Sequence, residues 1–196
     1  SAMVTSSLYV VGNSSLSVSS ANSENFSLHC YVYLESTAGF ATAIQRVFSK
    51  ASSQTSVEYN LFTNSSSGTL VFRFGANTGG VGTNTVDVYA SSLGTINTGQ
   101  WYSVVCWSSA NSHLGISVNL SVNTFPIVGG ATQVTSSGML TIGMINTAGG
   151  DQSLYGRLDE LGFWKKVLSV QERADLYSNG SGNTYSSALA SGLQFP

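Results

Sequence analysis

The chain has 196 residues, of which 7 are Lys or Arg and 9 are Asp or Glu, so it carries a net charge of −2 and is only 8% charged. This length is typical of one β domain, and the few cations exclude nucleic-acid binding by phosphate neutralisation. No apolar run approaches the ~20 residues needed to span a membrane, and roughly a quarter of the residues are Ser or Thr. Such a neutral polar surface favours an extracellular, secreted or virion-surface protein.

The N-terminus begins with Ser1-Ala2-Met3, which is typical of the remnant left when a protease removes a tag. We therefore assign residues 1–3 to a cleavage scar and residues 4–196 to a single domain. No linker, charge block or internal repeat divides the rest of the sequence. The first strands are predicted at Leu8–Val11 and Leu16–Ser19.

The segment Phe26–Leu34 alternates between apolar residues and the set Ser27, His29, Tyr31 and Tyr33. This pattern predicts a strand with one face in the core and one face pointing outward. The outward face would then carry His29, Tyr31 and Tyr33 as an exposed row about 13 Å long. The alternative is that a loop covers these rings, or that they pack against neighbouring strands.

Alternation and turn residues predict further strands along the chain. They lie at Ala43–Ser49, Val57–Thr63, Thr69–Phe74, Val86–Tyr89, Trp101–Trp107, Leu114–Val122, Met139–Ile142 and Tyr155–Trp164. The two cysteines, Cys30 and Cys106, lie in apolar stretches. They are interpreted either as two buried thiols or as one disulfide between neighbouring strands.

One segment near the C-terminus departs from the strand pattern. Ser169-Val170-Gln171-Glu172 is a capping box, with Ser169 at the N-cap and Glu172 three residues later. It predicts a short helix over about 169–178, which ends at Asn179-Gly180. About a dozen strands and one short helix predict an all-β, two-sheet antiparallel sandwich.

The C-terminal third also resembles a known family. Tyr155–Trp164, Leu168-Ser169 and Glu172–Tyr177 resemble the closing motif of laminin-G-like domains in the concanavalin A-like lectin/glucanase (jelly-roll) superfamily. Val47–Lys50, Gly99–Val105 and Leu140–Gly143 resemble other strands of that family, and they come in the same order. The resemblance implies a jelly roll in which Phe26–Leu34 belongs to the sheet whose outer surface is concave in sugar-binding relatives.

Two features depart from the family pattern. Asn119 is followed by Leu120 where the family often has Asn-Gly, and the family's Asp-rich opening is replaced by a Ser-rich segment. That opening can contribute to a calcium site in relatives, so its loss weakens the expectation of bound Ca²⁺. Calcium needs six to eight oxygen ligands, and we expect Asp151 and Asp159 to supply carboxylates if a site exists.

Catalysis is not expected from the carboxylates of this chain. Hydrolysis of a glycoside with retention needs two carboxyl groups about 5 Å apart, and the E-x-D-x-E signature of laminarinase-like relatives is missing. Asp159 and Glu160 are adjacent, so on a regular strand they point to opposite faces. Glu35 and Glu58 are isolated, and neither histidine lies in a nucleophile motif.

The sequence therefore predicts a non-catalytic, lectin-like carbohydrate-binding module of a larger protein, with a glycan or polysaccharide as partner. Aromatic rings would stack on the sugar and polar groups would read its hydroxyls. The candidate ligand-binding residues are His29, Tyr31, Tyr33, Asn60, Arg73 and Trp107. Trp107 is assigned either to this patch or to the core, because its strand is apolar on both faces. The alternatives are an adhesion module that binds a protein partner, and a glycoside hydrolase.

Overall fold

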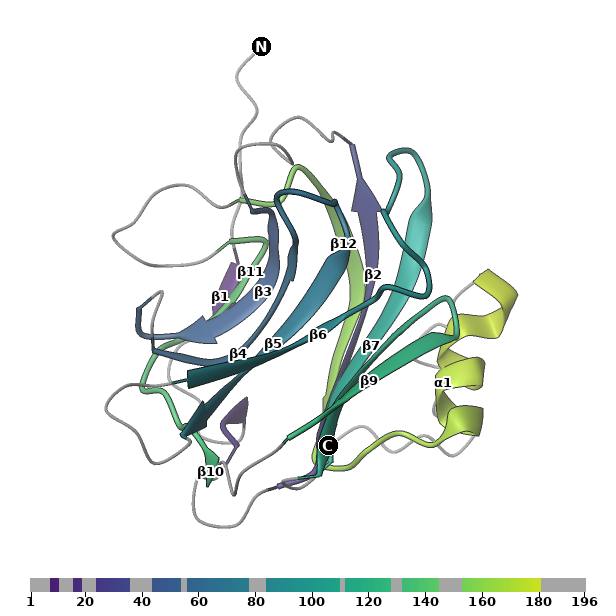
Figure 1. Ribbon diagram of the computed structural model, residues 1–196. Coiled ribbons are helices and arrows are strands. Elements are labelled where there is room, and N and C mark those ends of the chain that lie inside the picture. Colours follow the sequence, from purple (N-terminus) through teal and green to yellow (C-terminus); the bar gives the residue numbers. More distant parts are fainter. Residues whose placement is uncertain are drawn as a thin grey trace.

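The computed structural model describes residues 8–10, 16–18, 24–35, 44–53, 56–77, 84–109, 112–127, 132–144 and 153–180. Within these residues the chain forms two antiparallel sheets packed face to face, with one α-helix on the outside (Figure 1). The predicted two-sheet sandwich is confirmed. None of the helices in these segments is long and apolar enough to cross a membrane.

A seven-stranded sheet has the order β1-β11-β3-β4-β5-β10, with β6 also paired to β5. Its strands are β1 Leu8–Val10, β3 Arg46–Ala51, β4 Val57–Thr63, β5 Leu70–Asn77, β6 Asn84–Tyr89, β10 Thr132–Gln133 and β11 Leu140–Ile142. A five-stranded sheet has the order β12-β2-β7-β8-β9. Its strands are β2 Phe26–Leu34, β7 Trp101–Ser109, β8 His113–Val118, β9 Ser121–Pro126 and β12 Gly156–Trp164.

The core lies between the two sheets and follows the predicted alternation. Phe26, Leu28, Cys30, Val32 and Leu34 of β2 all point into it, as do Tyr59, Leu61, Phe72 and Phe74 from the other sheet. Cys30 and Cys106 are buried free thiols. Because every second residue of a strand points the other way, the intervening residues of β2, β4 and β5 lie on the outer faces of the sandwich.

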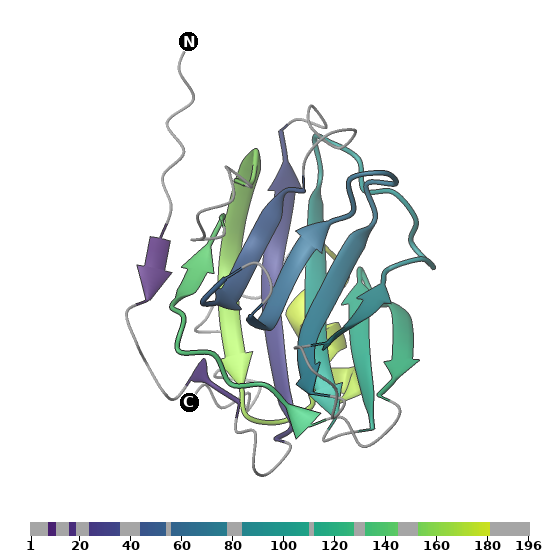
Figure 2. The same cartoon turned by 60° about the vertical axis from the view of Figure 1, so that its left-hand side comes forward.

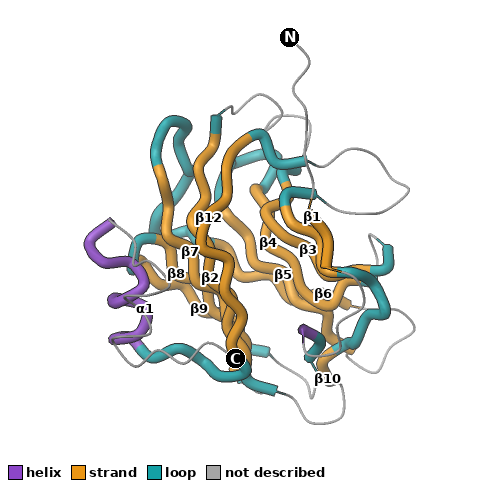
Figure 3. The backbone as a smooth tube through the Cα atoms, turned by 180° about the vertical axis from the view of Figure 1, so that it is seen from behind, coloured by secondary structure: helices purple, strands orange, loops and turns teal. Residues whose placement is uncertain are grey.

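The helix α1, Val170–Tyr177, forms where its capping box predicts. The Glu172 amide donates to the Ser169 hydroxyl, and the Ser169 amide donates to the Glu172 carboxylate. The helix ends at Ser178, whose φ of 42° is left-handed, and the 3-10 turn Ser178–Gly180 follows. Figures 2 and 3 show that α1 lies outside the five-stranded sheet, alongside β7.

Two of the predicted strands are wrong. Leu114–Val122 is two strands, β8 and β9, joined by the two-residue loop Asn119-Leu120, in which both φ values are positive. The apolar alternation runs on through the loop, because a two-residue insertion keeps the period of two. The Leu16–Ser19 strand is also absent from the described part of that segment, where Leu16 lies in a 3-10 turn and neither Ser17 nor Val18 belongs to a strand.

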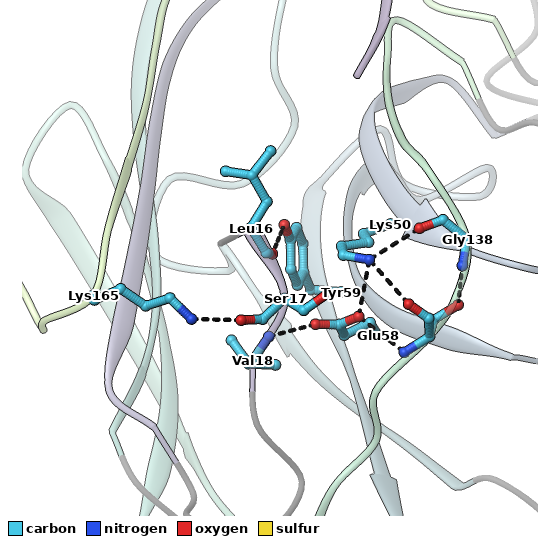
Figure 4. Close-up of polar contacts among 9 residues, drawn as sticks. Leu16, Ser17, Val18, Lys50, Glu58, Tyr59, Gly138 and Lys165 are labelled. Atoms are coloured by element: carbon cyan, nitrogen blue, oxygen red, sulfur yellow. Dashed lines mark hydrogen bonds and ion pairs between the residues drawn. The ribbon is translucent and has the colours of Figure 1, made fainter. Parts of the chain in front are cut away.

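A buried ion pair connects four segments that are distant in sequence (Figure 4). Glu58 on β4 accepts the Val18 amide at 2.6 Å and the Ser136 amide at 2.9 Å. Its carboxylate lies 3.2 Å from the Lys50 ammonium, which also donates to the carbonyls of Ser136 and Gly138. Burial of both side chains is tolerated here because every donor in this cluster has an acceptor.

Candidate functional site

The outer face of the five-stranded sheet is partly covered by α1. Leu168 and Leu176 pack on Val105, Trp107 and Trp164, and these residues form a second, smaller core. The Arg173 guanidinium lies 4.5 Å from the centre of the Trp107 ring. Trp107 can lie flat on the sheet because its partner in register is Gly115, where a Cβ would come within 2.0 Å of the ring.

The length of α1 determines how much of β2 is covered. At the start of the helical segment, the Leu168 amide donates to the Ser27 hydroxyl, which itself donates to the Lys166 carbonyl. At the far end, the Tyr31 hydroxyl donates to the Leu176 carbonyl. Four residues of strand rise about 13 Å and eight residues of helix rise about 12 Å. The helix therefore covers β2 from Ser27 to Tyr31 and ends before Tyr33.

The predicted exposed row is consequently wrong for two of its three members. His29 and Tyr31 are buried, and Trp107, which the sequence left open between patch and core, is buried as well. His29 contacts the Ser103 hydroxyl at 3.2 Å and the edge of the Tyr31 ring. Burial lowers the pKa of His29 to about 4, although a hydrogen bond to the Glu160 carbonyl opposes this shift. These side chains anchor the helix and are not accessible to a ligand.

The uncovered end of this face carries an aromatic pair. Tyr33 on β2 and Trp101 on β7 are in register, with ring centres 5.4 Å apart and planes inclined at 54°. Trp101 is 41% exposed and Tyr33 is half-buried. The two rings form a corner: the indole offers an accessible face, and the phenol ring stands beside it.

Charged groups flank this aromatic corner. Arg157 on β12 is in register with Tyr33, and its guanidinium lies 5.4 Å from the centre of that ring. The same guanidinium is paired with the Glu35 carboxylate at 2.8 Å, and the Arg157 and Glu35 side chains are 66% and 42% exposed. We call Tyr33, Trp101, Arg157 and Glu35 the aromatic corner. It combines an apolar ring surface with hydrogen-bond donors and acceptors.

Sequence reasoning found only Tyr33 of this group. Trp101 opens the Trp101–Trp107 strand, whose two faces are both apolar, so its position gave no indication of exposure. The strand register could have identified Trp101. A strand that pairs antiparallel with β2 and starts after the turn at Gly99 places its first residues beside the end of β2, where Tyr33 lies.

Asn60 and Arg73 lie on the opposite side of the molecule from the aromatic corner. Their expected partnership with the aromatic row is wrong, because β4 and β5 belong to the seven-stranded sheet. They are nevertheless direct neighbours there, at one register position. They belong to a polar row that crosses the outer face of that sheet, formed by Thr141, Ser49, Asn60, Arg73 and Asp87.

The polar row contains an unsatisfied amide. Asn60 is 0% exposed, and among the residues that the structure describes neither its Oδ1 nor its Nδ2 has a hydrogen-bond partner; the neighbouring Ser49 Oγ has none among them either. A buried polar group without a partner costs about 1–3 kcal/mol. By contrast, Arg73 donates two bonds of 2.7 Å to Asp87. A Phe62 ring on the same face lies 4.6 Å from the Arg46 guanidinium carbon and 5.0 Å from that of Arg73.

The carboxylates do not form a cage in the part of the chain that the structure describes. Asp159 is exposed and accepts the Glu160 amide at 2.9 Å, where a β-bulge gives Glu160 a φ of 51°. No group of three or more His, Cys, Asp or Glu residues gathers around a metal-sized space among the described residues. Asp151 lies outside these residues, so the calcium site at Asp151 and Asp159 stays a prediction.

A family model described as the concanavalin A-like lectin/glucanases superfamily, Laminin_G_3, matches residues 9–172. No curated protein matches the chain in sequence. The match extends from β1 into the first turn of α1, so it includes both sheets and the segment that leads into the covering helix.

Solved structures share the fold at low sequence identity. The binding domain of Paraclostridial Mosquitocidal Protein 1 has a TM-score of 0.66 and 14% identity, over 89% of this chain and 41% of that one. The botulinum neurotoxin serotype G binding domain has a TM-score of 0.58 and 12% identity, over 81% and 37%. The serotype D ligand-binding domain, solved with N-acetylneuraminic acid, has a TM-score of 0.56 and 11% identity, over 81% and 37%. The chain thus spans about two fifths of these proteins.

Proposed function

Because this chain belongs to the concanavalin A-like lectin/glucanase superfamily, we propose that it is a non-catalytic carbohydrate-binding module that holds a glycan at the aromatic corner. The observation that carries this proposal is the exposed Trp101 indole packed beside Tyr33, with Arg157 and Glu35 at its edge. Ligand sites typically combine an aromatic surface with a few convergent polar groups.

Each part of the corner has a role in this binding mode. The apolar C–H face of a pyranose ring would lie on the Trp101 indole, and the inclined Tyr33 ring would limit its position. Arg157 offers guanidinium donors and Glu35 offers carboxylate acceptors for the hydroxyls at the sugar's edge. Because Arg157 is already paired with Glu35 and rests near the Tyr33 ring, its donors are held in place before a ligand arrives.

The known structures support a binding role of this kind. The structural relatives are themselves binding domains, and one of them was solved with the sugar N-acetylneuraminic acid. At 11–14% identity, the similarity to these structures establishes only a shared fold. The sugar specificity of this chain is therefore a question for experiment. We propose an extracellular setting for the module, as one part of a longer protein.

A glycan array combined with affinity electrophoresis on soluble polysaccharides tests the proposal. The wild-type protein should bind at least one glycan, and Trp101→Ala should weaken that binding by roughly 30-fold, equivalent to about 2 kcal/mol for a central aromatic contact. Phe125→Ala is the matched control, since Phe125 is similarly exposed but lies on β9. The proposal fails if no glycan binds or if Trp101→Ala binds as the wild type does.

The same preparations separate the two competing functions. A protein-binding adhesion module would be silent on every glycan, and a glycoside hydrolase would release reducing ends from soluble glucans. Glu35 is the only carboxylate of the aromatic corner, whereas hydrolysis with retention uses a pair about 5 Å apart. We therefore expect no release of reducing sugar.

A further inference from the structure

The strand β9 forms one edge of the five-stranded sheet and lacks the features that normally keep an edge from pairing. Natural edge strands are short, charged or bulged, because an open row of backbone groups otherwise attracts another strand. Among the described strands, β1 and β10 have three and two residues, β6 carries Asp87, and β12 is charged and has a register shift after Asp159. By contrast, β9 has six residues, no charge and no register shift, and its one proline, Pro126, is its last residue.

The pairing of β9 with β8 identifies the backbone groups on its open side. The Ile127 amide donates to the Ser112 carbonyl at 2.8 Å, so this position, which continues the register of β8 and β9, is hydrogen-bonded. Hydrogen-bonded and non-bonded positions alternate along an antiparallel pair. The odd-numbered residues of β9 therefore bond to β8, and Val122 and Thr124 direct their amides and carbonyls to the open side.

The open side of β9 is accessible, and the strand is held in place from within the chain. Val122 is 43% exposed, and Thr124 is exposed as well. Asn123, between them, accepts the Ser92 amide at 3.0 Å and donates to the Ser91 hydroxyl at 3.0 Å. These bonds connect β9 to the turn after β6. Figure 2 shows β9 at the right-hand margin of the molecule. The edge is therefore ordered before any partner arrives, which lowers the entropy cost of pairing.

The open groups of β9 are complementary to those of an identical strand. In an antiparallel pair with Asn123 opposite Asn123 of a second copy, Val122 lies opposite Thr124 of that copy, and Thr124 lies opposite its Val122. Each of these two positions can exchange two N–H···O bonds, so every open amide of the two residues has an acceptor. The contact is the same on both sides, as a twofold axis requires. Because β9 carries no charge, the strands bring no like charges together. This self-complementarity favours a second copy over a segment of another protein.

We propose that β9 pairs antiparallel with β9 of a second copy of this chain, so that the two five-stranded sheets become one continuous sheet. The twofold axis is perpendicular to that sheet, so the helix α1 and the aromatic corner of each copy lie on the same side. A contact through one short strand is small, and we expect a dissociation constant on the order of 10–100 µM. The pairing would give the dimer two aromatic corners for one glycan surface. That consequence rests on the proposed function, whereas the pairing itself does not.

Sedimentation velocity from about 1 µM to about 1 mM measures the pairing without any glycan. The wild type should change from monomer to dimer over this range. Thr124→Pro removes one amide from the open side and leaves the pairing with β8 in place, because proline is tolerated where the missing N–H faces solvent. It should weaken dimerisation at least tenfold. Thr124→Val keeps the amide and is the matched control, and it should dimerise as the wild type does.

A second variant and a residue-specific measurement complete the test. Val122→Lys changes an exposed side chain, so it can be used if Thr124→Pro does not fold, and the added charge should also weaken dimerisation at least tenfold. By NMR at about 1 mM, the Thr124 amide should exchange with solvent at least about threefold more slowly in the wild type than in Val122→Lys. Trp101→Ala should dimerise normally, whether or not the aromatic corner binds a glycan.

Three results would overturn the proposal. A wild type that is still monomeric at about 1 mM would assign the open edge to a segment of a different protein. Normal dimerisation of both Thr124→Pro and Val122→Lys would place the contact elsewhere on the molecule. A wild-type dimer in which the Thr124 amide exchanges as fast as in Val122→Lys would exclude pairing through this edge.

Discussion

The hydroxyl of Tyr31 on β2 donates a hydrogen bond of 2.8 Å to the backbone carbonyl of Leu176 in the last turn of α1. The Tyr177 carbonyl, 3.0 Å away, shares the same hydroxyl hydrogen. The last carbonyls of a helix have no partner within the helix, so a side chain that satisfies two of them fixes where the helix end lies. Tyr31, which the sequence analysis predicted as a ligand contact, instead links the helix to the sheet.

Replacing Tyr31 by Phe should therefore weaken the docking of α1. The ring stays, but two carbonyls at a partly buried helix end lose their donor, so we expect a loss of about 1–2 kcal/mol in the free energy of unfolding. Urea denaturation measures this directly. Tyr89→Phe is the control: its ring is exposed on the other sheet, and the change should stay within about 0.5 kcal/mol. Equal midpoints for Tyr31→Phe and wild type would contradict this role of the hydroxyl.

The burial of His29 predicts a loss of stability in acid. Its pKa is lowered from 6.5 to about 4, chiefly by desolvation, so the folded protein holds this side chain neutral where the unfolded chain is protonated. The unfolded state then binds more protons between these two values, and stability falls as the pH falls from about 6.5 to 4. From the size of the shift, His29 contributes a loss of about 3 kcal/mol by pH 4.

Urea denaturation of His29→Gln at pH 8 and pH 4 isolates this contribution from that of the carboxylates. The difference in stability between the two pH values should be smaller in His29→Gln than in the wild type by about 3 kcal/mol. His113→Gln, which changes the other histidine of the chain, is the matched control. If all three proteins lost the same stability between pH 8 and pH 4, protonation of His29 would not be the cause of that loss.

Local patterns predicted the strands and the helix but not what covers them. Alternation in Phe26–Leu34 assigned the outward residues correctly, and the Ser169 capping box located α1. Neither pattern says which outward face the helix will cover, because that depends on the path of the chain between β12 and α1. The helix α1, which the sequence did predict, covers His29 and Tyr31. Of the predicted exposed row, only Tyr33 therefore remains accessible.

The second failure concerns which residues share a face. Asn60 and Arg73 were correctly expected to point outward, since each lies between two core residues. Grouping them with Tyr33 required knowing the sheet to which each strand belongs, and alternation is identical in both sheets. Trp101 was missed for a related reason: its exposure arises from its place at the open end of β7, beyond the reach of the helix.

The Asn119-Leu120 loop predicts a stabilising substitution. Leu120 has a φ of 68° and is 42% exposed, so its Cβ is strained and its side chain gains little from burial. Two-residue hairpin loops with positive φ at both positions favour Asn-Gly. Leu120→Gly should stabilise the fold by about 1 kcal/mol, a rise of roughly 2–4 °C in melting temperature. Leu120→Ala keeps the Cβ and should give little of this gain; equal gains would point to the lost side chain and not to backbone strain.

The pairing of Lys50 with Glu58 predicts strong coupling between two buried charges. Lys50→Met leaves the Glu58 carboxylate without its cation, and Glu58→Gln leaves the Lys50 ammonium without its anion. Each single change should therefore destabilise the fold by about 3–5 kcal/mol.

In the double variant neither charge is left unpaired, so its loss of stability should be clearly smaller than the sum of the two single losses. Urea denaturation of all four proteins measures the coupling as a double-mutant cycle. The pair Lys165–Glu24 is partly exposed, with side chains 39% and 35% accessible, and Glu24→Gln should cost at most about 1 kcal/mol. Strict additivity at Lys50 and Glu58 would mean that the two side chains stabilise their segments separately, through the backbone groups of Val18, Ser136 and Gly138 alone.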